Sequence, residues 1–130
     1  MYWTSCYAAI LGLIYIKLSL DVIRMRNAKK ISLGSAKDKE LKQKIRAHGN
    51  FIEYVPFSLI LLFLAENNAA GYILVHSAGL CLLLGRILHA YSFTRVPPRT
   101  RYRVLGMQFT FFSIMLGSVA NLYILFLGHI

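Results

Sequence analysis

The stretch VLGMQFTFFSIMLGSVANLYILFLG, residues 104–128, decides the class of this protein because it contains no charged residue. At about 1.5 Å per residue, a helix of this length spans about 37 Å. The hydrocarbon core of a bilayer is only about 30 Å thick. We therefore expect this stretch to cross a membrane as a helix, which satisfies its own backbone hydrogen bonds in lipid.

Three further apolar runs precede this stretch, at residues 1–20, 51–65 and 69–85, and the last extends to residue 93. Of the 130 residues, 57% are hydrophobic and 15% are charged, whereas about a quarter of the residues in a soluble domain are charged. This composition excludes an ordinary soluble domain, and its aromatic and branched apolar content excludes a disordered chain. The first run lacks the basic start and the small-residue cleavage site of a signal peptide.

We predict an all-α fold, an integral membrane four-helix bundle, in which residues 1–130 form a single domain. The expected helices cover residues 2–26, 36–66, 69–94 and 99–128. The second apolar run is short for a span, but Ser35 can cap a helix that begins at residue 36, with Asp38 completing a capping box. This helix then begins in the headgroup region and continues into lipid, and Pro56 is expected to kink it.

The formal net charge of +10 is concentrated in two parts of the sequence. Of the 15 Lys and Arg residues, nine lie between residues 24 and 46 and four more lie between residues 95 and 103. With four spans, these parts are the first and third loops, and the positive-inside rule places both in the cytoplasm and both termini outside. The charge therefore indicates topology rather than a nucleic-acid partner, and attraction to anionic lipid headgroups is an expected by-product.

Ionisable residues at membrane depth are costly and indicate a partner or a ligand. Arg46, Asn50 and Glu53 have spacings of four and three, which place them on one face of the second helix. Two interpretations are open for this group. It is either a hydrogen-bonded strut between helices or a polar wall that binds a charged ligand entering from the cytoplasmic side.

The third helix carries a second polar pair, Arg86 and His89, which share a face. Arg86 is too deep to reach the surface easily, so it needs a partner, and Glu53 is the expected one. Such an ion pair is either purely structural or part of a binding site. Asp21, in the first helix, is spaced to pair with Lys17 or with a later arginine.

Basic residues at two helix ends allow a structural and a functional interpretation. Arg103, with Arg101, lies at the start of the fourth helix, where it either fixes topology or binds a carboxylate or stabilises a thiolate. Arg24 and Arg26, at the end of the first helix, have the same ambiguity.

No phosphate-binding loop, nucleophile elbow or metal-ligand spacing is present, so no metal site is predicted. Cys6 and Cys81 lie inside apolar runs and are expected to be buried free thiols. His48 is expected to be a packing or interfacial histidine, and His76 a satisfied polar group.

The block Arg46-Ala-His-Gly-Asn50-Phe-Ile-Glu53-Tyr-Val-Pro56 resembles the helix-two signature of the MAPEG family, the membrane-associated proteins in eicosanoid and glutathione metabolism. Further support comes from VIRMR at residues 22–26, GRILH at residues 85–89 and the arginine at position 103. The resemblance covers essentially the whole chain in order, and the compact loops are most similar to the bacterial branch.

The resemblance implies a homotrimer in a bacterial inner membrane that binds glutathione, as co-substrate, between neighbouring subunits near the cytoplasmic face. Arg103 matches the arginine that stabilises the glutathione thiolate in family members and is the expected catalytic residue. The residues expected to bind glutathione are Arg24, Arg26, Arg46, Asn50, Glu53, Arg86 and His89.

The implied activity is that of a glutathione-dependent transferase or peroxidase acting on lipophilic electrophiles, docked in a groove between helices one and four. The chain departs from the family pattern where some members carry tyrosines, with Phe93 after the helix-three histidine and Met107 after Arg103. Two alternatives follow. One is a non-catalytic membrane protein of the same fold that binds glutathione or lipid, and the other is a small multidrug exporter that depends on Glu53.

Overall fold

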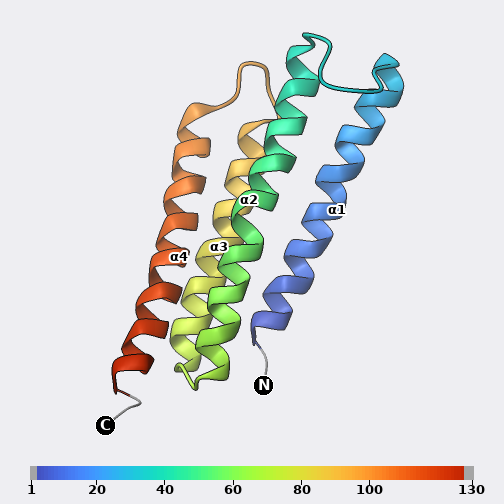
Figure 1. The fold of residues 1–130 in the computed structure, drawn as a ribbon. Coiled ribbons are helices and arrows are strands. Elements are labelled where there is room, and N and C mark those ends of the chain that lie inside the picture. The colour runs from blue at the N-terminus through green and yellow to red at the C-terminus, as the bar shows by residue number, and fades with distance from the viewer. Residues whose placement is uncertain (1–2, 128–130) are drawn as a thin grey trace.

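The computed structural model describes residues 3–127 as four helices joined by short connections. These are α1 (Trp3–Lys29), α2 (Lys39–Asn67), α3 (Tyr72–Ser92) and α4 (Thr100–Leu127), and no strand occurs among the described residues. The helices run up and down beside one another, with the first and last described residues at the same end (Figure 1). All four are long and apolar enough to cross a membrane. The prediction of an all-α membrane four-helix bundle is therefore confirmed.

The start of α2 differs from the prediction, because Asp38 and not Ser35 caps the helix. The Asp38 carboxylate accepts a hydrogen bond from the Leu41 amide at 2.7 Å and pairs with Lys29 at 2.6 Å. Ala36 and Lys37 have φ values of 46° and 63°, which no right-handed helix contains. The predicted capping box and the predicted helix start at residue 36 were therefore wrong. Residues 36 and 37 are not helical, and Asp38 is itself the N-cap.

The other helix boundaries lie within three residues of the prediction wherever the structure describes them. α1 continues to Lys29, and α3 begins at Tyr72 because Ala69 adopts a φ of 61°. α2 continues as a single helix through Pro56. The expected start of the first helix at residue 2 and the end of the fourth at residue 128 lie outside the described residues.

The most extensive helix interface joins α3 to α4 and depends on two glycines. A Cβ added to Gly106 would lie 2.7 Å from the carbonyl oxygen of Gly85, so the two backbones already touch. Hydroxyl and amide side chains of α4 add hydrogen bonds to neighbouring helices, from Ser113 to the Ala78 carbonyl at 2.7 Å and from Asn121 to the Leu61 carbonyl at 2.9 Å. Small residues and such bonds are the usual means by which helices associate in lipid.

α1 packs mainly on α2 and makes no contact with α4. His48 of α2 stacks on Tyr15 at 5.1 Å between ring centroids and hydrogen-bonds Ser19 at 3.0 Å. His76 of α3 hydrogen-bonds the Tyr7 hydroxyl at 3.0 Å. The predictions of a packing or interfacial His48 and a satisfied His76 are therefore confirmed.

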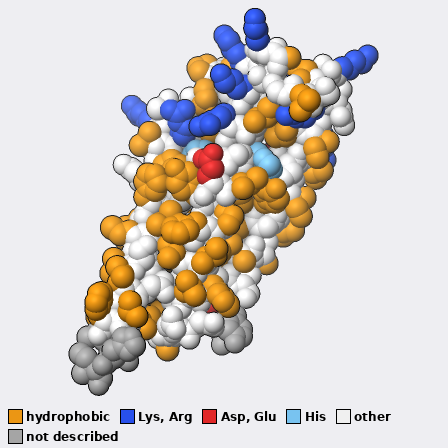
Figure 2. Space-filling view, in the orientation of Figure 1, with side chains coloured by type: hydrophobic (Ala, Val, Ile, Leu, Met, Phe, Trp, Pro, Cys, Tyr) orange, Lys and Arg blue, Asp and Glu red, His pale blue; other side chains and the backbone are white. Residues whose placement is uncertain are grey.

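The connections from α1 to α2 and from α3 to α4 lie at one end of the bundle, where Lys and Arg side chains gather above a mainly hydrophobic surface (Figures 1 and 2). Asp21 pairs with Lys17 at 2.8 Å, as its spacing predicted. Both cysteines are free, but the prediction that they are buried was wrong. Cys6 is exposed on the apolar surface and Cys81 is half-buried, because an apolar run in a membrane helix also covers the face toward lipid.

Candidate functional site

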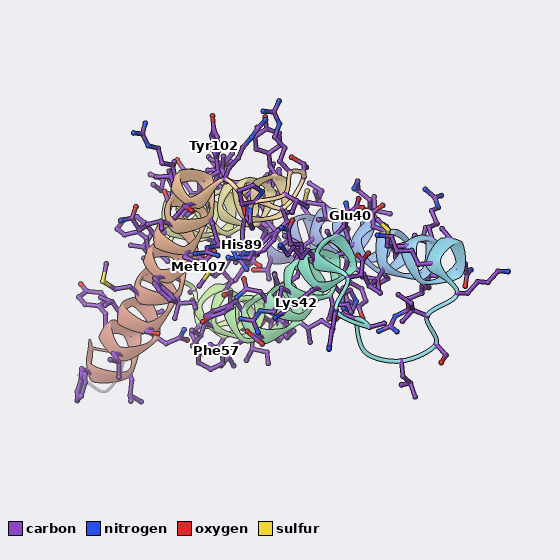
Figure 3. The ribbon with its side chains drawn as sticks, turned by 90° about the horizontal axis from the view of Figure 1, so that it is seen from above. Glu40, Lys42, Phe57, His89, Tyr102 and Met107 are labelled. Carbon is purple, nitrogen blue, oxygen red and sulfur yellow. The ribbon has the colours of Figure 1, made fainter. Side chains whose placement is uncertain are left out.

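A cavity of about 550 Å³ lies between α2, α3 and α4, toward the basic end of the bundle. Four of the eight predicted site residues, Arg46, Asn50, His89 and Arg103, line it. Figure 3 shows two of its lining residues, His89 and Met107, close together among these helices. Three helices therefore contribute to one site. The lining residues are Arg46, Asn50, His89, Phe93, Arg103, Val104, Met107, Gln108 and Phe111.

Arg86 lies directly behind this cavity and is buried, with 1% of its surface exposed. Its guanidinium donates to the Asn50 side-chain oxygen at 2.9 Å and to the Thr110 hydroxyl at 2.6 Å, and it contacts the Met107 sulfur at 3.4 Å. The Nε atom is buried and has no hydrogen-bond partner among the described residues. A full positive charge is thus held at membrane depth by neutral groups alone.

The predicted ion pair between Glu53 and Arg86 is absent from the described residues, and that prediction was wrong. Asn50, one turn before Glu53 on α2, occupies the position facing Arg86. Because three residues turn a helix by roughly 300°, Glu53 lies about 60° further around α2. Its side chain is exposed on the outer surface of the chain instead.

The charges around the cavity are all positive. Arg46 and Arg103 line it, Arg86 adjoins it, and no Asp or Glu of the described chain is among its lining residues. His89 is buried one turn after Arg86, with its ring 5.3 Å from that of Phe93. Such an arrangement attracts an anion, and guanidinium groups match the geometry of carboxylates in particular.

Besides Arg86, three predicted binding residues do not line this cavity. Arg24 is exposed near the end of α1, and Arg26 donates to the Ser32 carbonyl at 3.0 Å. Glu53 has no ion-pair partner in the described part of the chain. An exposed charge on a membrane helix is costly where it faces lipid.

The sequence model of the MAPEG family matches residues 4–123, which include every residue of the cavity. The chain belongs to the MAPEG family. Among its relatives are two proteins named "Inner membrane protein YecN", from Escherichia coli strain K12 and from Escherichia coli O6:H1 strain CFT073. Each is 36% identical to this chain over 120 residues, covering 92% of this chain and 90% of the relative.

Sequence reasoning about this MAPEG protein missed Thr110 and gave Met107 no part in holding Arg86. Both contact the Arg86 guanidinium from α4, and Thr110 also donates to the Gly106 carbonyl at 2.8 Å. A signal was present, because positions 103, 107 and 110 share one face of a helix. Gly106 marks the same region as a close contact between helices, where a buried hydroxyl has a backbone partner within reach.

Proposed function

We propose that this MAPEG protein is a glutathione-dependent membrane transferase or peroxidase that acts on lipophilic electrophiles. The observation that carries the proposal is Arg86, a buried charge with neutral partners only, beside a cavity lined by two further arginines. A buried charge without a counter-ion is costly. An anionic ligand in the cavity offsets that cost.

Glutathione fits such a site because it is an anionic tripeptide with one ammonium group and a thiol. Arg46 and Asn50 hold its carboxylate and amide groups, Arg86 adds its charge from behind Asn50, and His89 borders the same space. Glu53 binds the ammonium group, with Arg24 or Arg26 completing the site. Since these last three residues lie outside the cavity of one chain, the site is shared between neighbouring subunits of a homotrimer.

The thiol reacts as a thiolate, which the Arg103 guanidinium at the cavity lining stabilises. With an aromatic halide, the sulfur forms a bond to the ring carbon, the halide ion leaves, and the thiol proton passes to solvent. The bilayer concentrates lipophilic substrates beside the apolar surface of the chain. The relatives named as inner membrane proteins support a place in the inner membrane, with the basic end in the cytoplasm.

A second candidate is a membrane protein of the same fold that binds glutathione or lipid without turnover. The observation that favours it is the lining of the cavity by Phe93 and Met107, neither of which carries a hydroxyl for the reacting sulfur. The Met107 sulfur instead contacts the Arg86 guanidinium.

The test is calorimetric glutathione binding in detergent, followed by conjugation of chlorodinitrobenzene. We expect the wild type to bind and conjugate, and Arg103→Ala to bind but lose about 100-fold in turnover. Arg101→Ala is the matched control, because Arg101 is an exposed arginine of the same helix turn that does not line the cavity. Binding without turnover in the wild type would support the second candidate. An absence of glutathione binding would exclude the transferase or peroxidase and the glutathione-binding form of the second candidate.

A further inference from the structure

A second hollow, of about 360 Å³, lies at the basic end of the bundle between the start of α2 and the connection from α3 to α4. Its size falls within the range of small-molecule sites. Its polar wall comes from one face of α2 and its apolar wall from the connection. The residues that define it are Lys39, Lys42, Gln43 and Arg46, opposite Val96 and Pro97.

The three cations of this hollow have no acidic partner within residues 3–127. The two acids at the start of α2, Asp38 and Glu40, are both taken by Lys29 of α1, at 2.6 Å and 3.5 Å. Figure 3 shows Glu40 on the side of α2 toward α1 and Lys42 on the other side. The first turn of α2 is thus divided into a neutralised side and a positive side.

A comparison with another basic hollow makes this imbalance specific. The hollow between α1, α2 and α3, of about 260 Å³, also contains two lysines, Lys17 and Lys44. There Asp21 lies 2.8 Å from one ammonium group and 3.9 Å from the other. One carboxylate therefore partners both lysines of that hollow, whereas Lys39 and Lys42 have no acidic partner among the described residues.

Gln43 adds a requirement for a hydrogen-bond donor. It lines the positive hollow, and its side-chain oxygen is buried without a partner among the described residues. A buried acceptor left without a donor costs about 1–3 kcal/mol. The occupant must therefore offer an anion to the lysines, a donor to Gln43 and an apolar part to Val96 and Pro97.

We propose that this hollow binds the headgroup of an anionic phospholipid that carries a hydroxyl group. The phosphate lies between Lys39, Lys42 and Arg46, the headgroup hydroxyl donates to Gln43, and the glycerol ester region faces the apolar wall. The source is the membrane rather than free phosphate, because the hollow lies at the basic end of the bundle. At that end the Lys and Arg side chains lie next to a mainly hydrophobic surface (Figure 2). The site shares Arg46 with the proposed glutathione site, but its test requires no glutathione.

The test uses the full chain in detergent and measures lipid binding by native mass spectrometry. The probes are phosphatidylglycerol and phosphatidylcholine with the same acyl chains. We expect phosphatidylglycerol to bind more tightly, and Lys39→Gln with Lys42→Gln to weaken it by about fivefold for each lysine, about 30-fold together. The matched control is Lys30→Gln with Lys37→Gln, which removes the same charge from exposed positions at the same end.

Equal losses in the control pair would overturn the proposal, because binding would then follow net charge alone. Equal affinity for phosphatidylcholine, or displacement of the lipid by inorganic phosphate, would also overturn it. Circular dichroism of each variant verifies that the helices are intact.

The role of Gln43 has a separate measurement. Phosphatidylmethanol has the charge of phosphatidylglycerol but no headgroup hydroxyl. We expect the wild type to prefer phosphatidylglycerol by about fivefold, the worth of one hydrogen bond, and Gln43→Leu to lose that preference. A preference unchanged in Gln43→Leu would overturn the assignment of the hydroxyl contact.

Discussion

The close contact between α3 and α4 makes Gly106→Ala the most informative single change for the fold. The added Cβ would lie 2.7 Å from the carbonyl oxygen of Gly85 and 2.7 Å from the amide nitrogen of His89. Ordinary contacts begin at 3.4 Å, so the helices must separate by several tenths of an ångström. Both contacts are with backbone atoms, which cannot rotate away as a side chain can.

The size of the effect follows from two opposing contributions. Overpacking costs about 1–3 kcal/mol, and replacing a helical glycine by alanine returns about 1 kcal/mol. The net loss is up to about 2 kcal/mol, which lowers the unfolding midpoint by roughly 6–8 °C in a chain of this size. Because His89 and Met107 lie on the two helices that separate, we also expect weaker glutathione binding.

Thermal unfolding in detergent, followed by circular dichroism, measures this change. Gly12→Ala is the matched control, since a Cβ there meets nothing within 4 Å, and its midpoint should stay the same or rise. Gly85→Ala combined with Gly106→Ala should cost less than the sum of the two, because one separation of the helices accommodates both methyl groups. A Gly106→Ala midpoint as high as that of Gly12→Ala would refute the reasoning, because the added methyl group would then carry no packing cost.

Three further predictions concern the loop, the site and the surface. Hydrogen bonding from the Leu41 amide, then from Lys29, lowers the pKa of Asp38 below its ordinary value. The stability that the Asp38 charge contributes is therefore present above about pH 4 and is lost as the pH falls through the lowered pKa. The unfolding midpoints of the wild type and of Asp38→Asn should therefore converge in acid. Arg86→Met should retain the wild-type unfolding midpoint, because it removes a buried charge at similar volume. The same variant should lose glutathione binding, measured by calorimetry. Retained binding would contradict the proposed site. In detergent, a fluorescent maleimide should label Cys6 faster than the half-buried Cys81, and the reverse order would contradict the orientation of α1.

The number of helices and the end of the bundle that carries positive charge could be predicted, because they depend on the order of apolar and basic residues along the chain. The rotation of each helix about its own axis could not be predicted. In a soluble bundle, polar residues mark the outer face, but here the outer face is as apolar as the core. Asn50 and Glu53 share a helix face by spacing, and nothing in their types says which of them meets Arg86. For the same reason the sequence did not predict the part played by Thr110, because its hydrogen bond with Arg86 depends on the register between α3 and α4.

The basic residues of this chain do more than orient it. Topology requires only that positive charge lie at one end of the bundle, and several cations there are already satisfied. Lys29 pairs with Asp38, and Arg99 lies over the Tyr91 ring at 4.6 Å. The basic residues that line or adjoin a hollow and have no acidic partner in the described part of the chain lie instead on α2, α3 and α4.

The two hollows adjoin, because Arg46 and Phe93 line both of them. Unbalanced charge therefore continues from Lys39 at the end of the bundle, past Arg46, to the buried Arg86. A continuous positive path of this kind favours the entry of anions from the basic end. Reversing one charge at its entrance, with Lys42→Glu, should slow the association of glutathione more than its dissociation in stopped-flow measurements. An unchanged association rate would mean that the anion reaches Arg86 by another route.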